Sequence, residues 1–179
     1  MLSLSERLLH KTLRKLSKRY EPISYLEIGV REGDSLRAVL KGHHPSRIVL
    51  CDTWKDFYGG TNRGSGHHIE RLLKDLKYKG FLTIFSESSH TAIPKIRDTF
   101  DMITVDGDHT YNGALTDLRT CWSILNTDGI LVFDDVIHKS HKYLKDCIEN
   151  FIREVSDECV ILEKNYKDDN GIVVLMKNA

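Results

Sequence analysis

Neither charge is in excess in this chain, because 26 lysines and arginines balance 26 aspartates and glutamates. It therefore lacks the basic field that draws a protein non-specifically to nucleic acid or to an anionic membrane. It also lacks any apolar run close to the roughly 18 residues of a membrane-spanning helix. The charges scattered through residues 1–16 are not typical of a secretory signal. We expect a cytoplasmic protein with neither nucleic acid nor a membrane as a partner.

Cysteine is scarce, and its spacing carries no motif. The four cysteines are Cys51, Cys121, Cys147 and Cys159. They form no C-x-x-C pair, and no cysteine or histidine pair has the spacing of zinc ligands. A chain of 179 residues can bury a sizeable core without disulfides, so we interpret these cysteines as reduced thiols. We expect one domain over residues 1–179, with an N-terminal helix, residues 1–20, packed on it.

Two nucleotide-binding glycine patterns are also missing. The apolar residues 23–28 lead into Gly29 and Gly33, and a helical run follows through Leu36 and Leu40. A strand, a glycine turn and a helix start leave backbone N–H groups free to bind an anion. The spacing is neither G-x-G-x-x-G nor a phosphate loop that ends in Gly-Lys-Ser/Thr. This argues against an oxidoreductase that uses NAD.

What the chain does have is acids after two apolar runs near its middle. Residues 102–105 lead into Asp106, and residues 130–133 lead into Asp134 and Asp135. An amphipathic helical pattern separates the two runs, which predicts a right-handed βαβ unit with its parallel strands side by side. Neighbouring strands lie about 4.8 Å apart. We therefore expect the three acids to converge at the edge of the sheet where ligands bind in open α/β folds.

Three carboxylates at one point are a candidate metal site. Mg²⁺ prefers oxygen ligands, so it is the cation that this donor set favours. Simpler roles exist for single acids: Asp108 could cap the helix that follows it, and Asp135 could be a solvated turn residue. His138 and His141 are expected to be partly exposed helix histidines rather than catalytic groups.

Polar residues follow two further apolar runs. Asp52 follows residues 47–51, where it could accept hydrogen bonds from a ribose or could cap a turn. The turn that begins at Ser86, after residues 81–85, could contact an adenine and could equally cap a helix that ends near residue 97. Residues 54–66 combine glycines with aromatic side chains, which fits a mobile lid, an acceptor-binding loop or a plain surface loop.

The ends of the chain complete the expected fold. Ser3 with Glu6 is a capping-box pattern that predicts the start of the N-terminal helix. A helix is expected over residues 138–155, and residues 159–163 and 172–176 are expected to form a hairpin. The alternation of strands and helices predicts an α/β fold, a three-layer doubly wound sheet that is mostly parallel with an antiparallel strand in the C-terminal hairpin.

Together these features resemble the class I S-adenosylmethionine-dependent methyltransferases. The resemblance is closest to the small metal-dependent O-methyltransferases, the branch that holds macrocin and other sugar O-methyltransferases. It covers about residues 25–176, and the segments that carry it are LEIGVREGDSL, FDMITVDGDHTYNGALTDL and GILVFDDV. It implies a Rossmann-like methyltransferase sheet, S-adenosylmethionine as cofactor, a divalent cation, and a small-molecule hydroxyl acceptor such as a sugar or another vicinal diol. In this family the segment before the first strand often builds the acceptor pocket or a homodimer.

The resemblance also implies roles for single residues. The cofactor-binding positions would be Glu27, Gly29, Gly33, Ser35, Asp52, Glu87, Ser88 and Asp106. The metal ligands would be Asp106, Asp134 and Asp135. His109, three residues after the first ligand, would be the general base beside Asp106. Two alternatives stay open: a methyltransferase that needs no metal and acts on another acceptor, and a protein that binds the cofactor without catalysis.

Overall fold

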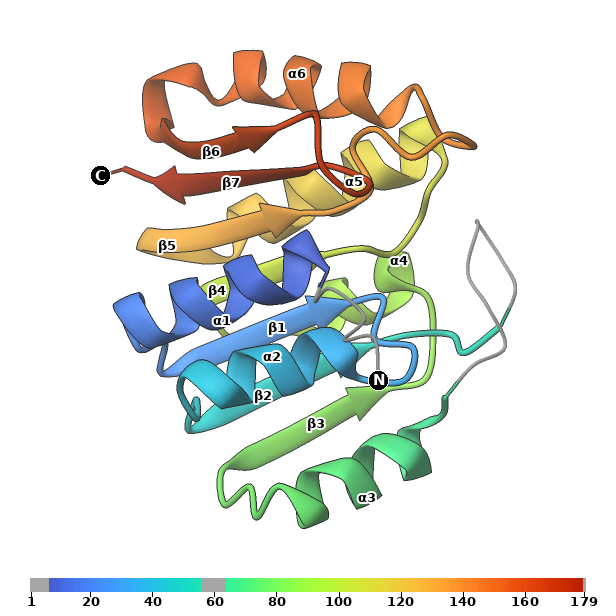
Figure 1. The fold of residues 1–179 in the computed structure, drawn as a ribbon, viewed down its shortest axis with the longest axis vertical. Helices are drawn as coiled ribbons and strands as arrows, with labels where there is room; N and C mark the ends of the chain where they lie inside the picture. Colours follow the sequence, from blue (N-terminus) through green and yellow to red (C-terminus); the bar gives the residue numbers. More distant parts are fainter. Residues whose placement is uncertain (1–6, 56–63, 179) are drawn as a thin grey trace, which may run out of the picture.

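A seven-stranded sheet forms the middle layer of the computed structural model, which describes residues 7–55 and 64–178. The strand order is β3-β2-β1-β4-β5-β7-β6 (Figure 1). The strands are β1 (Ser24–Ile28), β2 (Arg47–Cys51), β3 (Phe81–Phe85), β4 (Phe100–Val105), β5 (Leu125–Phe133), β6 (Cys159–Asn165) and β7 (Ile172–Lys177). The helices are α1 (Leu8–Tyr20), α2 (Asp34–Gly42), α3 (Gly66–Asp75), α4 (Ser89–Ala92), α5 (Tyr111–Ser123) and α6 (Leu144–Glu154), with 3₁₀ turns η1 (Ile93–Lys95) and η2 (Ser156–Glu158).

The pairing confirms the predicted mixed sheet. Strands β3, β2, β1, β4 and β5 pair in parallel, whereas β7 is antiparallel to both β5 and β6. Ile28 at the end of β1 pairs with Cys51 and with Val105, and Val105 pairs with Phe133. The four strands therefore end level with one another. The chain leaves β1 towards β2 on one side and reaches β4 on the other, so the switch point of the sheet lies between β1 and β4.

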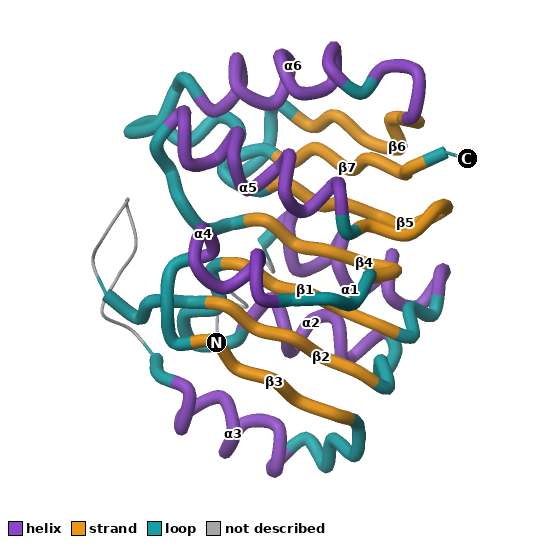
Figure 2. The backbone as a smooth tube through the Cα atoms, turned by 180° about the vertical axis from the view of Figure 1, so that it is seen from behind, coloured by secondary structure: helices purple, strands orange, loops and turns teal. Residues whose placement is uncertain are grey.

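Helices cover both faces of the sheet, which gives the three layers. One apolar cluster joins the sheet to α1, α2 and α3 through Leu13, Val39 and Leu72. A second cluster on the opposite face joins it to α5 and α6 through Leu118 and Phe151. Figures 1 and 2 show these two faces in turn. Every residue of β1 is buried, as expected for a strand covered on both faces.

Two helices are shorter than the sequence predicts. The helix expected to end near residue 97 stops at Ala92, because Pro94 has no N–H for an α-helical hydrogen bond and leaves only a 3₁₀ turn. The helix expected from His138 begins at Leu144. Residues 138–143 form turns instead, closed by the N–H of His141 bonded to the carbonyl of His138. This loop lies beside the carboxyl end of β5.

Some predictions fall outside the described residues. The capping box of Ser3 and Glu6 lies there, and so do Phe57 and Tyr58 of the predicted lid. Among the helices of the described ranges, none has the length and apolar character needed to cross a bilayer. The cytoplasmic location stays a prediction.

Candidate active site

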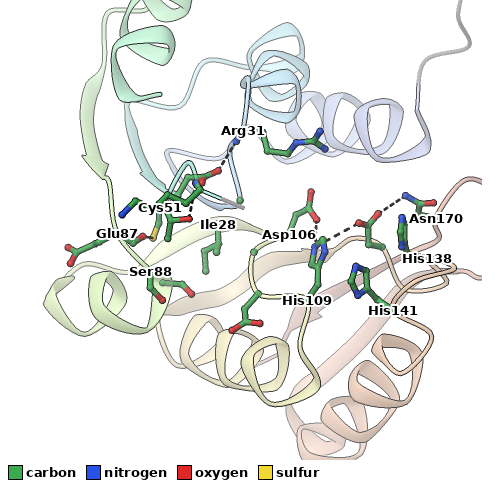
Figure 3. Close-up of a pocket in the computed structure, with 18 of the residues that line it drawn as sticks. Ile28, Arg31, Cys51, Glu87, Ser88, Asp106, His109, His138, His141 and Asn170 are labelled. Atoms are coloured by element: carbon green, nitrogen blue, oxygen red, sulfur yellow. Dashed lines mark hydrogen bonds and ion pairs between the residues drawn. The ribbon is translucent and has the colours of Figure 1, made fainter. Parts of the chain in front are cut away.

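A cavity of about 270 Å³ opens at the carboxyl ends of β1, β2, β4 and β5. Figure 3 shows its lining, which comes from the loops after these strands, the turn after β3 and the β6–β7 turn. Seven residues predicted from the sequence line it: Gly29, Asp52, Glu87, Ser88, Asp106, His109 and Asp135. The other four, Glu27, Gly33, Ser35 and Asp134, do not. The cavity therefore lies at the switch point, where the fold places ligands.

The floor of the cavity depends on a glycine. Gly29 has a φ of +83°, and a Cβ atom on it would lie 1.8 Å from the backbone oxygen of Asp106. Only glycine adopts this conformation and leaves room for such an approach. The turn after β1 therefore touches the end of β4, which places the predicted cofactor corner directly beside the first acid of the predicted metal site.

Asp52 holds the turn after β1 in place. Its Oδ2 accepts hydrogen bonds from the backbone N–H groups of Val30 and Arg31, each at 2.8 Å. Its Oδ1 accepts the N–H of Trp54 at 2.6 Å. The turn-capping role is thus present, and Asp52 also lines the cavity, while its contact with a ribose stays a prediction. A carboxylate offers about four acceptor positions, and three of these are used. One position remains, on Oδ1, for a hydroxyl from a ligand.

Glu27 is fully buried and only half satisfied. Its Oε2 lies 2.8 Å from the hydroxyl of Tyr25, whereas Oε1 has no hydrogen-bond partner among the described residues. Burial, together with the nearby carboxylates of Asp106 and Asp52, raises the pKa of Glu27 to about 8. A buried carboxylate with a free oxygen is costly unless a donor reaches it. Glu27 therefore lacks one donor, which a cationic ligand group could supply.

Gly33 and Ser35 lie at the start of α2, outside the cavity lining. Gly33 has a φ of +81°, and a Cβ atom there would lie 2.7 Å from Leu72 and 2.9 Å from Ile69 of α3. Its observed role is thus the packing of α2 against α3. Ser35 is half-buried in the first turn of α2. Its predicted contact with the cofactor stays a prediction.

In the turn after β3, the side chains of Glu87 and Ser88 already have partners within the protein. Ser88 caps α4, since its Oγ accepts the N–H of His90 at 3.3 Å. Glu87 pairs with Lys95, whose Nζ lies 2.6 Å from both carboxylate oxygens. The capping role considered for this turn is therefore present. Both residues still line the cavity, so the predicted adenine contact stays open to them.

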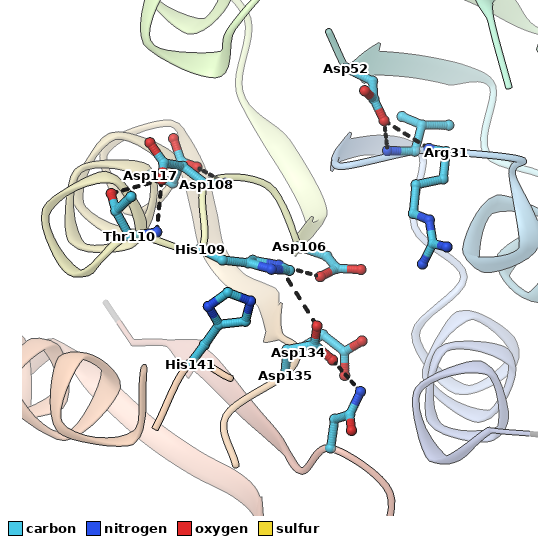
Figure 4. A network of polar contacts seen from close by, with 12 residues as sticks. Arg31, Asp52, Asp106, Asp108, His109, Thr110, Asp117, Asp134, Asp135 and His141 are labelled. Atoms are coloured by element: carbon cyan, nitrogen blue, oxygen red, sulfur yellow. Dashed lines mark hydrogen bonds and ion pairs between the residues drawn. The ribbon is translucent and has the colours of Figure 1, made fainter. Parts of the chain in front are cut away.

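Two of the three predicted carboxylates come together, and an imidazole joins them (Figure 4). His109 Nε2 lies 3.1 Å from Asp106 Oδ1 and 3.8 Å from Asp135 Oδ2. Each of these residues offers one ligand atom within 4.8 Å of the others. We call Asp106, His109 and Asp135 the acid–histidine cluster. Within the described residues this is the arrangement that could hold a metal ion.

Asp134 faces a different partner. Its side chain is 2% exposed, and Oδ2 lies 3.0 Å from a guanidinium nitrogen of Arg7. The same nitrogen lies 3.4 Å from Asp135 Oδ1. Arg7 thus bridges the two neighbouring carboxylates, whereas Asp134 is not part of the group of ligand atoms that Asp106, His109 and Asp135 bring together. The geometry thus differs from the predicted trio of aspartates.

Burial and neighbouring charges shift the pKa values of Asp106, His109 and Asp134. Burial and the neighbouring carboxylates of Asp106 and Asp135 raise the pKa of Asp134 well above its ordinary value. Burial likewise raises the pKa of Asp106, against the hydrogen bond from His109. For His109, burial lowers the pKa, but the hydrogen bond and the charge of Asp106, with the other acids, raise it overall. The site therefore favours cations.

Sequence reasoning missed several cavity residues. His138 and His141 both line it, with the ring of His141 centred 5.0 Å from that of His109 and 5.1 Å from that of His138. Arg31 also lines it, and its Nε is a buried donor without a partner in the described residues. Arg7 contacts acids 127 residues away in the sequence. Local periodicity carries no signal for such a contact.

Asp108 serves the next helix. Its Oδ1 accepts hydrogen bonds from the N–H and the Oγ1 of Thr110, both at 2.8 Å. Thr110 in turn caps α5 through the N–H of Gly113 at 3.1 Å. The cap of α5 is thus Thr110 and not Asp108, the residue considered for it from the sequence; Asp108 instead holds the capping threonine. This capping orders the loop that carries His109.

Comparison with sequence families and known proteins agrees with this picture. A family model described as a methyltransferase domain matches residues 26–136. Among curated proteins, the uncharacterised protein R132 of Acanthamoeba polyphaga mimivirus is 25% identical over 139 residues, which is 69% of this chain and 57% of that protein. The chain thus spans little more than half the length of this relative.

Solved structures share the fold. The O-methyltransferase TomG from Streptomyces achromogenes, involved in tomaymycin synthesis and solved in complex with SAM, has a TM-score of 0.73 and 14% identity, covering 95% of this chain and 79% of that one. The O-methyltransferase from Bacillus cereus in complex with SAH has a TM-score of 0.71 and 14% identity, covering 99% of this chain and 84% of that one. These TM-scores show a shared fold, and at 14% identity the similarity shows the fold alone.

Proposed function

This chain belongs to the family of methyltransferase domains, and on that premise we propose that it transfers a methyl group from S-adenosylmethionine to a hydroxyl of a small molecule, a sugar or another vicinal diol. The observation that carries the proposal is one cavity that joins the glycine corner of Gly29 and Asp52 to the acid–histidine cluster. Methyl transfer to a hydroxyl needs the cofactor beside a site that aligns the acceptor and takes its proton, and this cavity can provide both.

The residues present fit the cofactor. Glu27 is buried outside the cavity lining, so its free Oε1 would meet the α-ammonium group only where the ligand opens a path to it, whereas the remaining acceptor position of Asp52 suits a ribose hydroxyl. Glu87 and Ser88 line the cavity, and we assign the contact with the adenine to them. S-adenosylmethionine, when bound, supplies a methyl group on a positively charged sulfur. The chain then has to hold the acceptor oxygen in line with that methyl group.

The acid–histidine cluster fits a divalent cation, with one change from the sequence prediction. Two carboxylates and an imidazole form a mixed oxygen and nitrogen set, which suits Mn²⁺ and similar cations as well as Mg²⁺. A divalent cation, when bound, would polarise the acceptor hydroxyl and help to orient it. Asp134 would join such a set only after its contact with Arg7 breaks.

His109 is the proposed proton acceptor. Its Nε2 faces Asp106 Oδ1 at 3.1 Å, and its Nδ1 is buried without a partner among the described residues. As a metal ligand His109 would use Nε2 and could not also be the base, so this role belongs to the state in which Nε2 donates to Asp106 and Nδ1 is left to take the proton of the acceptor hydroxyl. Asp106 would stabilise the imidazolium that forms.

A second candidate is a methyltransferase that needs no metal. The contact of Arg7 with Asp134 and Asp135 favours it, because a fixed positive charge already stands among the acids. The two candidates differ in one simple property. Removal of divalent cations abolishes the first activity and leaves the second unchanged.

The test combines binding and turnover. Titration calorimetry with S-adenosylhomocysteine and with NAD measures which cofactor binds, and mass spectrometry then measures S-adenosylhomocysteine formed from S-adenosylmethionine on a panel of sugars and catechols. We expect binding of S-adenosylhomocysteine alone and product formation that EDTA abolishes and Mg²⁺ or Mn²⁺ restores. Binding of NAD instead would refute the function. Full activity in EDTA would select the metal-free candidate, and binding without turnover would indicate a pseudoenzyme.

A further inference from the structure

We propose that Arg7 is a built-in counter-cation of the acids after β4 and β5, which a divalent cation must displace, so that Arg7 sets how tightly this site holds metal. The inference rests on the proposed function only in taking these acids as the metal site. It concerns a residue outside the segment that the family model matches, residues 26–136. Arg7 directly precedes α1, and its side chain contacts the two acids that follow β5.

The contacts show an exposed cation on buried acids. The Arg7 side chain is 37% exposed, whereas those of Asp134 and Asp135 are 2% and 12% exposed. One guanidinium nitrogen lies 3.0 Å from Asp134 and 3.4 Å from Asp135. Arg7 also lines the cavity. The guanidinium therefore enters from the solvent side, and the carboxylates are the fixed partners.

Either the Arg7 guanidinium or a divalent cation can neutralise these carboxylates, and the two compete for them. Asp106, Asp134 and Asp135 bring three carboxylates together at one end of the sheet. Arg7 contacts Asp134 and Asp135, and His109, when protonated, adds a second positive charge beside Asp106 and Asp135. Carboxylates this deeply buried require a compensating charge. A divalent cation on Asp135 would stand next to the guanidinium on the same carboxylate, and the two like charges would repel each other.

The surroundings allow Arg7 to leave without unfolding α1. The N–H of Leu8 donates to Asp169 in the β6–β7 turn, and the next turn residue, Asn170, donates through Nδ2 to Asp135 Oδ1 at 2.8 Å. The start of α1 is thus held by its backbone, independently of the Arg7 side chain. Displacement needs only rotation of a long, half-exposed side chain. Asn170 keeps Asp135 oriented meanwhile.

A purely structural ion pair would behave differently. If Arg7 only stabilises the fold, its removal lowers the free energy of unfolding and leaves metal affinity unchanged or lower. If Arg7 competes with metal, its removal raises metal affinity. The sign of the change in affinity therefore separates the two roles, and it can be read without any acceptor or turnover.

The experiment titrates Mn²⁺ into the full chain and follows free Mn²⁺ by electron paramagnetic resonance. Arg7→Met removes the charge and keeps most of the length, and Arg7→Lys keeps the charge. Arg119→Met is the matched control, since it breaks a surface ion pair with Glu154. We expect Arg7→Met to bind Mn²⁺ about tenfold more tightly, within the usual range for coupled sites, and Arg7→Lys and Arg119→Met to stay near the wild type.

Each other outcome is decisive. Equal or weaker Mn²⁺ binding by Arg7→Met than by the wild type overturns the inference. Failure of both proteins to bind Mn²⁺ overturns it together with the metal in the proposed function, while S-adenosylhomocysteine binding, measured separately, reports on the methyltransferase function itself. Should Arg7→Met fail to fold by circular dichroism, Arg7→Gln carries the same comparison with the same expected sign.

Discussion

At the scale of single residues, Glu27 is the acid whose position is hardest to explain by folding alone. It is fully buried in the central strand, with one oxygen lacking a partner in the described residues. An isosteric neutral residue would serve the fold better. A glutamate that destabilises the ligand-free fold is explained if its carboxylate binds the ammonium group of a cofactor.

Replacing Glu27 by glutamine should separate stability from binding. The folded-state pKa of about 8 lies above the ordinary value of 4.5, so the folded protein favours the protonated form. The stability this provides is complete below pH 4.5 and is lost as the pH rises through 8. We expect urea unfolding of the ligand-free protein to show Glu27→Gln gaining over the wild type from pH 5 to pH 9, on the order of a few kcal/mol.

The same variant should bind S-adenosylhomocysteine less tightly, by about tenfold or more, because a neutral amide replaces the charge facing the ammonium. Glu70→Gln on the exposed surface of α3 is the control and should change neither quantity. If Glu27→Gln binds as well as the wild type, Glu27 does not contact the cofactor. A parallel pH profile in both proteins would argue against the raised pKa.

His109 carries the proposed proton transfer. We expect His109→Gln to lower turnover by about a hundredfold or more, which is typical for loss of a general base, and to leave S-adenosylhomocysteine affinity nearly unchanged. His67→Gln, whose parent side chain is 92% exposed on α3, is the control. Initial rates and calorimetry measure the two effects. Retained turnover in His109→Gln would assign the proton to another group.

At the residue scale, the sequence could predict contacts that follow from adjacent strands and could not predict contacts between distant segments. Asp106 and Asp135 follow adjacent parallel strands, so their approach could be predicted from the apolar runs before them. The position of Asp134 outside the cluster could not be predicted, because Asp134 pairs with the distant Arg7 and the run of apolar residues before it gives no sign of the left-handed backbone at Asp135, where φ is +59°. Nor could Arg7, whose contact spans 127 residues.

At the scale of elements, the turn between β1 and α2 is the unit that the cofactor would meet. Asp52 holds it through two backbone N–H groups, those of Val30 and Arg31. At the opposite end of β1, Asp101 does a similar task, accepting from the N–H groups of Ile23 and Ser24 at 3.0 and 2.9 Å. One carboxylate stands at the ligand edge of the sheet and the other at the far edge.

This pair provides a matched comparison. We expect Asp52→Asn and Asp101→Asn each to lower the free energy of unfolding by about 1–3 kcal/mol, since an amide N–H₂ would face backbone donors. Only Asp52→Asn should also weaken S-adenosylhomocysteine binding, by about tenfold. Denaturant unfolding and calorimetry give both numbers. Equal effects of the two variants on binding would reduce Asp52 to a structural role.

The boundaries of helices and strands were predicted well where the hydrophobic pattern is distinct and poorly where it is weak. The strands at residues 47–51 and 81–85 were predicted with the bounds they have, because each is a compact apolar run. The loop 138–143 was predicted as helix, since its polar residues carry no strong stop signal. Its turns depend on contacts such as that of the Tyr143 hydroxyl with the carbonyl oxygen of His109 at 2.7 Å, which periodicity does not encode.

At the scale of the whole molecule, the two apolar clusters hold the sheet rigid while its carboxyl edge carries the charged groups. The α/β fold and the antiparallel strand in the C-terminal hairpin were predictable from the alternation of runs. The oligomeric state was not. Val160, Ile161 and Leu162 are exposed on the edge strand β6, and the possible homodimer stays a prediction.

A ligand that bridges the loops of four strands should stabilise the whole fold. At a concentration of one hundred times its dissociation constant, S-adenosylhomocysteine should add about 2.7 kcal/mol, which corresponds to a rise in melting temperature of roughly 5–10 °C for a domain of this size. NAD at the same concentration is the control and should give no shift. Scanning fluorimetry measures both, and a comparable shift with NAD would contradict the assignment.

The most direct test of the central claim is anomalous diffraction from a crystal grown with S-adenosylhomocysteine and Mn²⁺. We predict S-adenosylhomocysteine along the cavity between Gly29, Asp52 and Ser88, and an anomalous peak held by Asp106, His109 and Asp135. S-adenosylhomocysteine bound elsewhere, or a cavity that stays without it at saturating concentration, would contradict the proposed methyltransferase site.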